Sequence, residues 1–576
     1  MAFITLMQNN FTSGEISPRL EGRPDIPRYQ TGLRRALNVI PLRQGPFTKR
    51  PGTIFSSRTK GDQTARLIAF EASDGTPYLF EFTPLALRIY TAAGVQYGSD
   101  LTTPYAAADL AGLKWAVNKG SMWIAHPSYA VRKVTFSAGS FSISTPTFTG
   151  DRTFSASGEY PRGICFHQGR LVLMGCDNRP DEICLSRPPD ASTGADRYTD
   201  FDLDTNNDGT IVASDAIILQ KSDQGPVALR WGVSHLRMVL ASSRLVAMDN
   251  GELATPSGFD YQTCLRGHPL DIQGELAEQF VLYLGAGPSL HALYFSSDDG
   301  GYLNVEVTKD ADHILQPSVV GLAVMSAPAP IAWVVRSDGL VASVSIDGTA
   351  GIMAPALQDL SGIVESAAAI PGDRSDTLWL CINRDGKHCL ESLTIPHPYA
   401  LELEDEHYVD SGIVYSGSAT TTISGLGHLE GKTVSILADG KIQAPKTVAS
   451  GSITLDKAAS KVHVGLPIHS EAETLRAEVP ANGTSQGKKR RIDEVTLRLF
   501  RSLGGSVAVS GKASTPLLYL TAGEYIYGSA LDPFTGDKKK SINGGLDADT
   551  TLVISHDEPC PFTVLAIIYK VALLEA

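Results

Sequence analysis

Short β-branched and aromatic runs, separated by Asp-Gly turns, recur along most of this chain. The Asp-Gly pairs begin at Asp299, Asp338, Asp347, Asp385 and Asp439. Asp and Gly tolerate the positive φ that a type I′ turn requires, so a pair between two apolar runs predicts a β-hairpin. Residues 333–335, 341–346 and 377–382 have the composition and length of strands. The pattern therefore predicts a mainly β fold.

Composition limits the number and kind of domains. The 576 residues are 43% hydrophobic and 19% charged, which is typical of a chain that folds into about two to four domains. Many short strands favour a propeller, a sandwich or a barrel. Residues 61–400 can hold several four-stranded blades of roughly 40–50 residues each. A propeller, a sandwich and a barrel all stay open for this segment, and no repeat motif fixes a number of blades.

Three other segments complete the predicted organisation. Residues 106–118 place Leu110, Leu113 and Val117 on one helical face, so we expect a short helix. Residues 401–576 return to an alternating pattern and are expected to form one or more C-terminal β domains. Within them, residues 481–491 are polar and end in a basic run, which predicts a mobile, solvated loop.

Residues 1–60 differ from the rest of the chain in charge and proline content. They carry ten Lys and Arg against three acidic residues, a net charge of +7; the whole chain is −13, so the remainder is −20. Six prolines interrupt regular structure, and only residues 30–40 could hold a short helix. We expect an extended basic arm that docks on a neighbouring copy or on another acidic protein. The residues predicted to dock it are Arg19, Arg23, Asp25, Arg34, Arg35 and Arg50.

One loop has the spacing of a calcium-binding loop. Asp204, Asn206 and Asp208 place oxygens at positions 1, 3 and 5, Gly209 stands at position 6, and Asp215 stands at position 12. Position 12 is Asp instead of the longer bidentate Glu, and no amphipathic helices flank the loop. The loop is therefore a weak candidate for an ion site, and a surface turn between strands is the favoured alternative.

No other pattern predicts a metal, cofactor or catalytic site. The seven cysteines include no CxxC pair, and we expect reduced thiols in the core. His388 and Cys389, with Cys381 before them, lack the spacing of a zinc site. HExxH, GxSxG and phosphate-loop motifs are absent. We therefore predict a protein that is not an enzyme and has no cofactor, and its net negative charge argues against a free-standing binder of duplex DNA.

The N-terminal residues resemble the opening of a known family. The matching segments are Asn10-Phe11, Gly14-Glu15-Ile16-Ser17-Pro18-Arg19-Leu20, Gly22-Arg23-Pro24-Asp25 and Lys49-Arg50-Pro51-Gly52-Thr53. They are similar to the start of the tail nozzle proteins of short-tailed bacteriophages (podoviruses), also called tail tubular protein B or stabilisation proteins. Later segments that resemble this family are Asp109-Leu110, His126-Pro127-Ser128-Tyr129, Gly169-Arg170-Leu171, Leu185-Ser186-Arg187-Pro188, Trp333-Val334-Val335, Gly425-Leu426 and Pro533-Phe534-Thr535-Gly536-Asp537. The chain departs from the family near residues 348–355, where a tryptophan-bearing strand is expected.

The resemblance implies a structural virion protein. It implies a β-propeller-like domain over residues 61–400 with additional β domains after it. The assembly would be a homohexameric nozzle below the portal and adaptor rings, with tail fibres or a needle as further partners and the host envelope at its tip. Genomic DNA would pass through during ejection without sequence-specific binding. The motif arginines would bind carbonyls or carboxylates, and His126 and His428 would form hydrogen bonds in turns. The protein would be made in the bacterial host cytoplasm and carried in the virion tail. A different class of function stays open, that of a tail-associated protein that binds or depolymerises carbohydrate with a propeller face.

Overall fold

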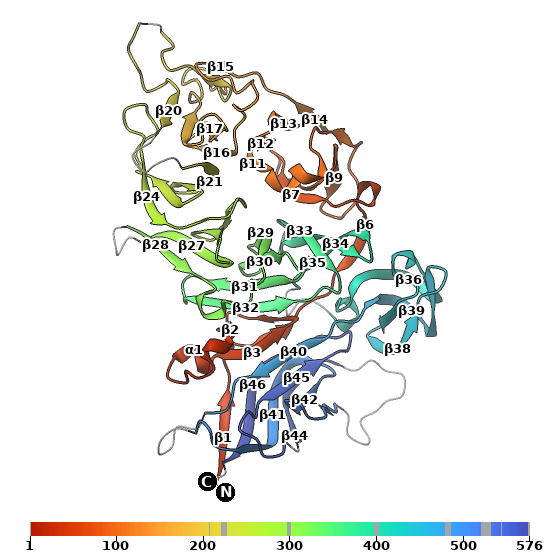
Figure 1. Cartoon of the computed structure of the whole chain (residues 1–576). Helices are drawn as coiled ribbons and strands as arrows, with labels where there is room; N and C mark the ends of the chain where they lie inside the picture. Colours follow the sequence, from red (N-terminus) through yellow and green to blue (C-terminus); the bar gives the residue numbers. More distant parts are fainter. Residues whose placement is uncertain are drawn as a thin grey trace.

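Strands make up almost all of the regular structure in the computed structural model of this chain (Figure 1). The structure describes residues 2–206, 208–220, 227–296, 301–396, 402–478, 485–519, 532–542 and 544–573. They form a β-propeller, a β-sandwich that holds both termini, and a four-stranded domain at its side (Figure 1). The predicted fold class, a mainly β chain with a propeller-like domain and additional β domains, is confirmed.

Seven antiparallel four-stranded blades form the propeller within the described residues. Five blades are separate sheets, and the last two are the ends of larger sheets. The first strand of blade 7 packs on the first strand of blade 1, which closes the ring. In chain order the blades are β7 (Arg66–Glu71), β8 (Pro77–Thr83), β9 (Ala86–Thr91) and β10 (Leu101–Thr102); β11 (Lys114–Asn118), β12 (Ser121–His126), β13 (Tyr129–Ser137) and β14 (Ser140–Ser144); β16 (Gly163–His167), β17 (Arg170–Met174), β18 (Glu182–Leu185) and β20 (Ile217–Gln220); β21 (Leu229–Ser234), β22 (Met238–Ser242), β23 (Leu245–Asp249) and β24 (Tyr261–Arg266); β25 (Glu275–Ala277), β26 (Phe280–Gly285), β27 (Ser289–Ser296) and β28 (Gly301–Glu306); β29 (Val319–Met325), β30 (Ile331–Arg336), β31 (Val341–Asp347) and β32 (Ile352–Gln358); and β33 (Ile363–Ile370), β34 (Thr377–Arg384), β35 (Lys387–Thr394) and β6 (Ile54–Arg58). The short strands β15 (Thr149–Gly150) and β19 (Asp200–Phe201) pair outside the blades.

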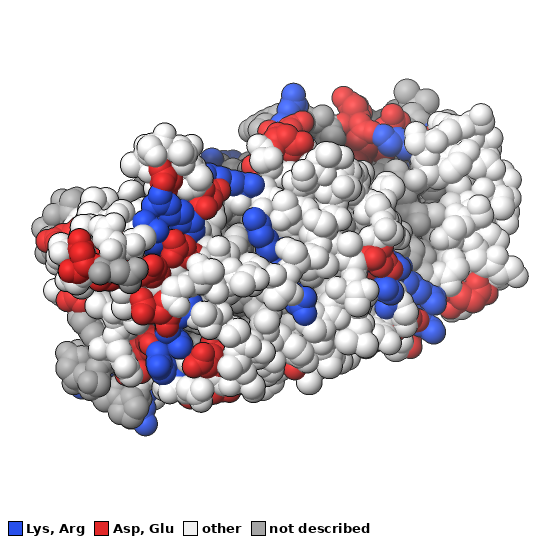
Figure 2. Space-filling view, turned by 90° about the horizontal axis from the view of Figure 1, so that it is seen from above, with Lys and Arg blue, Asp and Glu red and all other residues white. Residues whose placement is uncertain are grey.

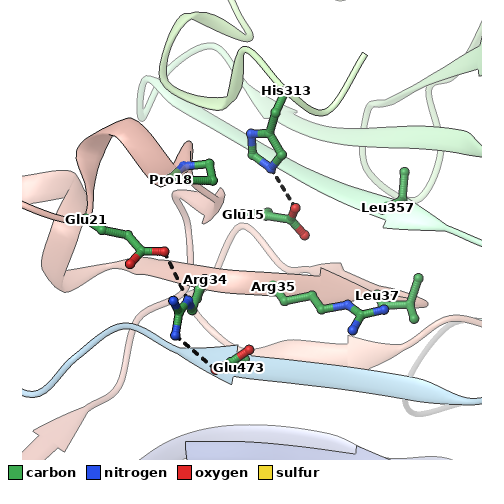
Figure 3. A pocket seen from close by; sticks show the side chains of 9 residues that line it. All are labelled: Glu15, Pro18, Glu21, Arg34, Arg35, Leu37, His313, Leu357 and Glu473. Atoms are coloured by element: carbon green, nitrogen blue, oxygen red, sulfur yellow. Dashed lines mark hydrogen bonds and ion pairs between the residues drawn. The ribbon is translucent and has the colours of Figure 1, made fainter. Parts of the chain in front are cut away.

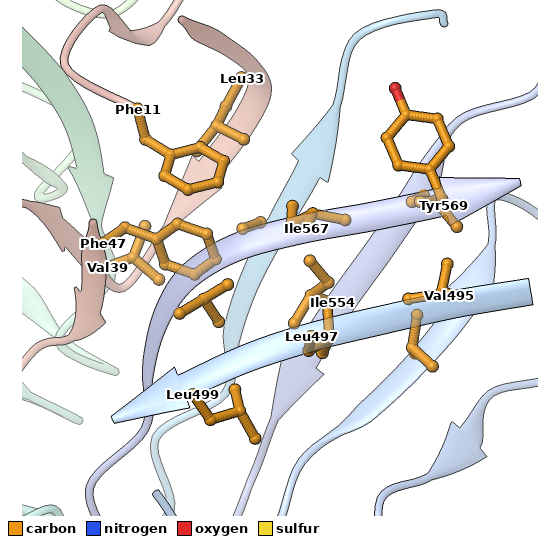
Figure 4. Packing of buried hydrophobic residues seen from close by; sticks show 14 of the residues in the cluster. Phe11, Leu33, Val39, Phe47, Val495, Leu497, Leu499, Ile554, Ile567 and Tyr569 are labelled. Atoms are coloured by element: carbon orange, nitrogen blue, oxygen red, sulfur yellow. The ribbon is translucent and has the colours of Figure 1, made fainter. Parts of the chain in front are cut away.

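The sandwich is built from the two ends of the chain. One sheet contains β1 (Ala2–Gln8), β4 (Val39–Pro41), β5 (Phe47–Lys49), β41 (Arg490–Ser502), β44 (Phe534–Ser541) and β46 (Thr563–Leu573). The other contains β2 (Gly14–Glu15), β3 (Gly32–Leu37), β40 (Ser470–Thr474), β42 (Ser506–Val509), β43 (Thr515–Pro516) and β45 (Leu552–His556). Their alternating apolar residues form one core (Figure 4), in which the rings of Phe11 and Phe47 meet edge to face at 4.9 Å.

The side domain lies between the propeller and the sandwich in the sequence. It consists of the long strands β36 (Asp410–Ser424) and β39 (Ser452–Leu466) with the hairpin β37 (Thr433–Ala438) and β38 (Lys441–Thr447). Its own apolar core includes Ile436 and Val462. The domain projects from the body in Figure 1.

The N-terminal segment is extended, as predicted, but it is built into the body instead of forming a separate docking arm. β3 lies between β32 of blade 6 and β40 of the sandwich. β6 is the outer strand of blade 7 and also pairs with β36 of the side domain. Residues 30–40 therefore do not form the predicted helix. The chain has only α1 (Pro27–Gln30) there, and β3 follows because its register with β40 buries Leu33 and Ala36.

The predicted helix at residues 106–118 is wrong beyond its first half. η3 (Ala107–Gly112) is a 3-10 turn, and Leu113 then leaves helical geometry at ψ 128°. Trp115 and Val117 lie in β11 and pair with β12. Strand pairing within a blade therefore overrides the helical spacing. The other 3-10 turns within the described residues are η1 (Pro18–Leu20), η2 (Lys60–Asp62), η4 (Lys309–Ala311), η5 (Leu403–Asp405) and η6 (Gly427–Leu429).

Candidate functional site

Arg50 stands where the propeller, the sandwich and the side domain meet. Its side chain is fully buried, and so is that of Asp410. The guanidinium donates to both carboxylate oxygens of Asp410 at 2.7 and 2.6 Å. It also donates to Asn38 Oδ1 at 2.9 Å, to the Asp359 carbonyl at 2.6 Å and to the Pro51 carbonyl at 3.1 Å. One side chain therefore bonds to β-sandwich, propeller and side-domain residues, in the bidentate geometry that only arginine provides.

The polar network continues from Thr53 into blade 7. Thr53 Oγ1 donates to Glu391 Oε2 at 2.5 Å and accepts from the Ser411 amide at 2.8 Å. Glu391 in turn accepts two hydrogen bonds from Arg384, at 2.7 and 2.9 Å. Buried charges of this kind are tolerated because each one is paired and hydrogen-bonded.

Gly52 is required by close packing at this junction. A Cβ atom there would lie 2.0 Å from the Val409 carbonyl oxygen and 2.5 Å from the Val409 nitrogen. The Gly52 amide also donates to the His407 carbonyl at 2.8 Å. Arg50, Gly52 and Thr53 therefore each have a structural reason to be present, and we call residues 50–53 with Asp410, Glu391 and Arg384 the three-domain junction.

A second junction joins the N-terminal segment to the propeller. Gly14 has φ +59°, and a Cβ atom there would lie 2.2 Å from the Pro355 carbonyl oxygen. Glu15 accepts from the Ala36 amide at 2.7 Å and pairs with His313 at 2.8 Å. Glu15 and His313 line an open cavity of about 370 Å³ (Figure 3). Its remaining lining residues are Pro18, Glu21, Arg34, Arg35, Leu37, Leu357 and Glu473.

The residues predicted to dock the arm bind the chain's own body. Arg19 pairs with Asp312 at 2.9 Å, Arg35 with Glu471 at 3.0 Å, and Arg34 with Asp549 at 3.4 Å. The basic charge of the segment is thus matched by acidic residues of the same chain. The exception is the exposed pair Arg23–Asp25, whose members pair with each other at 2.8 Å.

Lys49 is a buried cation that sequence reasoning did not single out. Its Nζ lies 3.1 Å from His556 Nδ1 and donates to the Glu558 carbonyl at 2.8 Å. Burial lowers the pKa of Lys49 from 10.5 to about 8. Burial and then the charge of Lys49 lower the pKa of His556 well below its usual value. The neutral imidazole can therefore accept from the lysine.

The candidate calcium loop is folded as a set of turns. Asp204 accepts from the Gly209 amide at 2.8 Å, and Asp208 accepts from the Thr210 amide at 2.7 Å. Asp215 is buried, where it accepts from the Val212 amide at 2.8 Å and from Thr205 Oγ1. Among the described residues, these carboxylates do not form a group of three with oxygens within 4.8 Å of one another. The arrangement matches the predicted surface turn, in which carboxylates bind backbone amides.

The basic run at 488–491 is only partly exposed. Residues 481–484 lie outside the described part of the chain, so the predicted mobile loop is described only from residue 485 onwards. Arg490 begins β41 and is fully buried, where it donates to the Ser485 carbonyl at 2.9 Å. The expectation of a solvated charge run is wrong for this residue.

The seven cysteines are free thiols, and all but Cys264 are buried. Sequence spacing nevertheless missed one cluster. Glu365, Cys381 and His388 place an oxygen, a sulfur and a nitrogen within 4.8 Å of one another. No sequence motif could find it, because the three residues come from three strands of blade 7.

Several segments that resemble the nozzle family contact one another. Tyr129 donates to Asp109 at 2.7 Å, and His126 accepts from the Ser128 amide at 3.1 Å within the His-Pro turn. Arg170 donates to the carbonyls of Ser186 and Asp215, at 2.8 and 2.7 Å. His428 bonds to the Ser411 carbonyl at 2.8 Å and stacks on Phe55. Arg170 therefore bonds backbone carbonyls, and His126 and His428 each form a hydrogen bond within or beside a turn.

Comparisons with known proteins give only remote similarities. No family model matches the chain, and no curated protein matches it. Similar solved structures include the RRP9 WD40 repeats, at TM-score 0.38 and 10% identity, covering 61% of this chain and 100% of that one. The Myceliophteria thermophila Cps50 (Swd1) β-propeller domain gives TM-score 0.38 and 10% identity, over 60% and 100% of the two chains. YCF48 bound to D1 peptide gives TM-score 0.36 and 10% identity, over 61% and 100%. At these values no function is carried over to this chain.

Proposed function

We propose that this chain is a structural subunit of the tail nozzle of a short-tailed bacteriophage. Six copies would form a ring below the portal and adaptor rings, with tail fibres or a needle attached, and the genome would leave through the ring. The proposal rests on the resemblance of the N-terminal and later segments to that family. It is supported most by the three-domain junction, because residues 50–53 are the closing residues of the resembling segment and hold all three domains together.

The axis of a single propeller is closed in this structure. The Trp115 amide donates to Gln273 Oε1 at 3.1 Å, and Gln273 Nε2 donates to the Trp115 carbonyl at 3.0 Å. Trp115 lies in the first strand of blade 2, whereas Gln273 precedes the first strand of blade 5. Blades 2 and 5 are not neighbours, so these bonds cross the axis. A DNA channel would therefore have to run between copies of the chain and not through one propeller.

Surface charge fits a subunit that contacts several protein partners. The face shown in Figure 2 carries acidic and basic side chains next to one another, and much of it is uncharged. A single basic field, which phosphate binding would require, is not seen on this face.

The tryptophans do not favour the carbohydrate alternative. Trp123, Trp231, Trp333 and Trp379 are buried in the cores. Trp115 lies beneath the Arg66 guanidinium at 5.6 Å. No tryptophan platform for stacking on sugars is present among these five residues.

Mass photometry of the purified full-length protein, at rising concentration, tests the proposal. We expect a species of about six times the mass of one chain, with few intermediates because a ring closes. An assay of host surface polysaccharide runs in parallel. A chain that stays monomeric at all concentrations and shortens or binds the polysaccharide would contradict the nozzle function and support the alternative.

A further inference from the structure

Three neighbouring strands of blade 7 direct a carboxylate, a thiol and an imidazole to one point. Asn383 on β34 pairs with His388 on β35, and Cys381 is two residues from Asn383. Side chains two residues apart on a strand share a face, so Cys381 and His388 point to the same side. On β33, the pairing with β34 shifts between Val364 and Ser366, and this bulge contains Glu365. Bulges turn a side chain toward a new direction, which here brings Glu365 to the same group.

The distances are close to those of a metal-ligand set. Glu365 Oε2 lies 2.8 Å from His388 Nδ1 and 3.6 Å from Cys381 Sγ. Zinc binds S at about 2.3 Å and N or O at about 2.0–2.2 Å, so tetrahedral ligand atoms lie roughly 3.3–3.7 Å apart. Shifts of about half an ångström in the side chains would therefore open space for an ion.

We propose that Glu365, Cys381 and His388 form a binding site for a zinc-class divalent cation. The three ligands leave a fourth position for water, as in zinc sites that keep one position open. Asn383 completes the surroundings, because its amide lies 3.4 Å from Glu365 Oε1 and can orient the carboxylate. The inference concerns a site within one chain and does not depend on the proposed nozzle function.

The site combines a buried ligand with access from solvent. Cys381 is fully buried, whereas the side chains of Glu365 and His388 are 20% and 15% exposed. An ion can thus enter past the two partly exposed ligands and bind the thiol beneath them. Binding replaces the S–H bond by an S–metal bond, and the thiol proton is released to solvent. The hydrogen bond from His388 Nδ1 to the Glu365 carboxylate is lost. Its proton moves through solvent to Nε2, so that the ring stays neutral, and Nδ1 and the carboxylate each bind the metal instead.

The neighbouring cysteine provides a matched control. Cys389 is also buried and directly follows His388, but its Sγ contacts the Lys387 carbonyl at 3.8 Å and is not part of the cluster. Cys389→Ser therefore removes a buried thiol from β35, the strand that carries His388, without removing a proposed metal ligand. Cys381→Ser and His388→Gln each remove one.

Cobalt(II) titration of the chelator-treated, full-length protein tests the proposal. We expect about one cobalt per chain, with a thiolate-to-cobalt charge-transfer band, and displacement of that band by zinc. The band should persist in Cys389→Ser and be lost in Cys381→Ser, and His388→Gln should weaken cobalt binding at least about tenfold. Circular dichroism of each variant without metal confirms that it is folded.

Two results would overturn the assignment. One is a folded wild-type protein that binds no cobalt or shows no charge-transfer band. The other is a band that survives in folded Cys381→Ser, which would place the metal elsewhere. If Cys381→Ser does not fold, Glu365→Gln with His388→Gln decides the question, since both residues are partly exposed. Unchanged cobalt affinity in that double variant would reject the site.

Discussion

Replacing Arg50 by Met should be among the most damaging single changes in this chain. The substitution removes five hydrogen bonds, two of them to the buried carboxylate of Asp410. Asp410 would keep the Thr53 amide at 3.3 Å as a donor but would lose its counter-ion. Breaking a buried ion pair by removing one partner costs about 3–5 kcal/mol. Because this is a large share of the roughly 5–15 kcal/mol that stabilises a domain, the junction should open.

Hydrogen exchange measured by mass spectrometry can locate the effect. Peptides that cover residues 50–53 and 410–412 should lose protection by a factor of about 10²–10⁴, which corresponds to the expected free energy at about 1.36 kcal/mol per tenfold change. Peptides of blade 3, far from the junction, should keep their protection. The matched control is Arg19→Met, because the Arg19 side chain is 85% exposed in its pair with Asp312. It should cost at most about 1 kcal/mol.

A double-mutant cycle separates the ion pair from the other contacts of Arg50. Asp410→Asn should itself destabilise the junction. The double variant should lose less stability than the two single variants lose in sum, and the difference gives a coupling energy of about 1–3 kcal/mol. Arg50→Met within about 1 kcal/mol of wild type, or protection lost equally in blade 3, would refute the role given to this residue.

Three further changes test other parts of the structure. Burial lowers the pKa of Lys49 from 10.5 to about 8, so between these pH values the unfolded chain binds a proton that the folded chain has lost. The free energy of unfolding of the wild type, relative to Lys49→Met, should therefore rise by up to about 3 kcal/mol from about pH 7.5 to 10.5 in urea unfolding. A pH-independent difference would contradict the burial of a charged lysine. Gly52→Ala should lower the free energy of unfolding by at least about 1–3 kcal/mol, because the new Cβ atom would lie 2.0 Å from the Val409 carbonyl oxygen. A Cβ atom at Gly22 would meet no atom within 4 Å, so Gly22→Ala should change stability by less than about 0.5 kcal/mol. Equal effects of the two changes would argue against close packing at Gly52. Calcium or a calcium chelator should leave exchange protection of residues 204–215 unchanged, because the carboxylates already bind amides; a calcium-dependent rise in protection would show that the loop is an ion site.

The sequence predicted those features that depend on local chemistry. Hairpins follow from turn residues: Gly75, Gly339 and Gly440 all adopt the positive φ that the turns demand. The buried thiols follow from the lack of paired cysteine motifs. Many short strands favour a propeller, a sandwich or a barrel, and the structure contains a propeller and a sandwich. The expectation of a propeller itself comes from the family resemblance.

Features that depend on distant pairing could not be predicted in the same way. Residues 114–118 have helical spacing, but their register with β12 makes them a strand. The basic N-terminal segment reads as a free arm, because the acids that pair with it, such as Asp312 and Glu471, lie hundreds of residues away. The spacing of Cys381, His388 and Cys389 argues against a zinc site and gives no reason to consider Glu365. A bulge and two strand registers bring Glu365, Cys381 and His388 together.

We propose that copies of this chain form a ring-shaped conduit. Electron cryomicroscopy of the purified assembly decides this, because two-dimensional classes report the rotational symmetry and the position of the channel. We expect a six-fold ring with a channel that lies between the propellers, and with the axis of each propeller closed by Trp115 and Gln273. Monomers, or a ring whose open channel runs through one propeller, would contradict it.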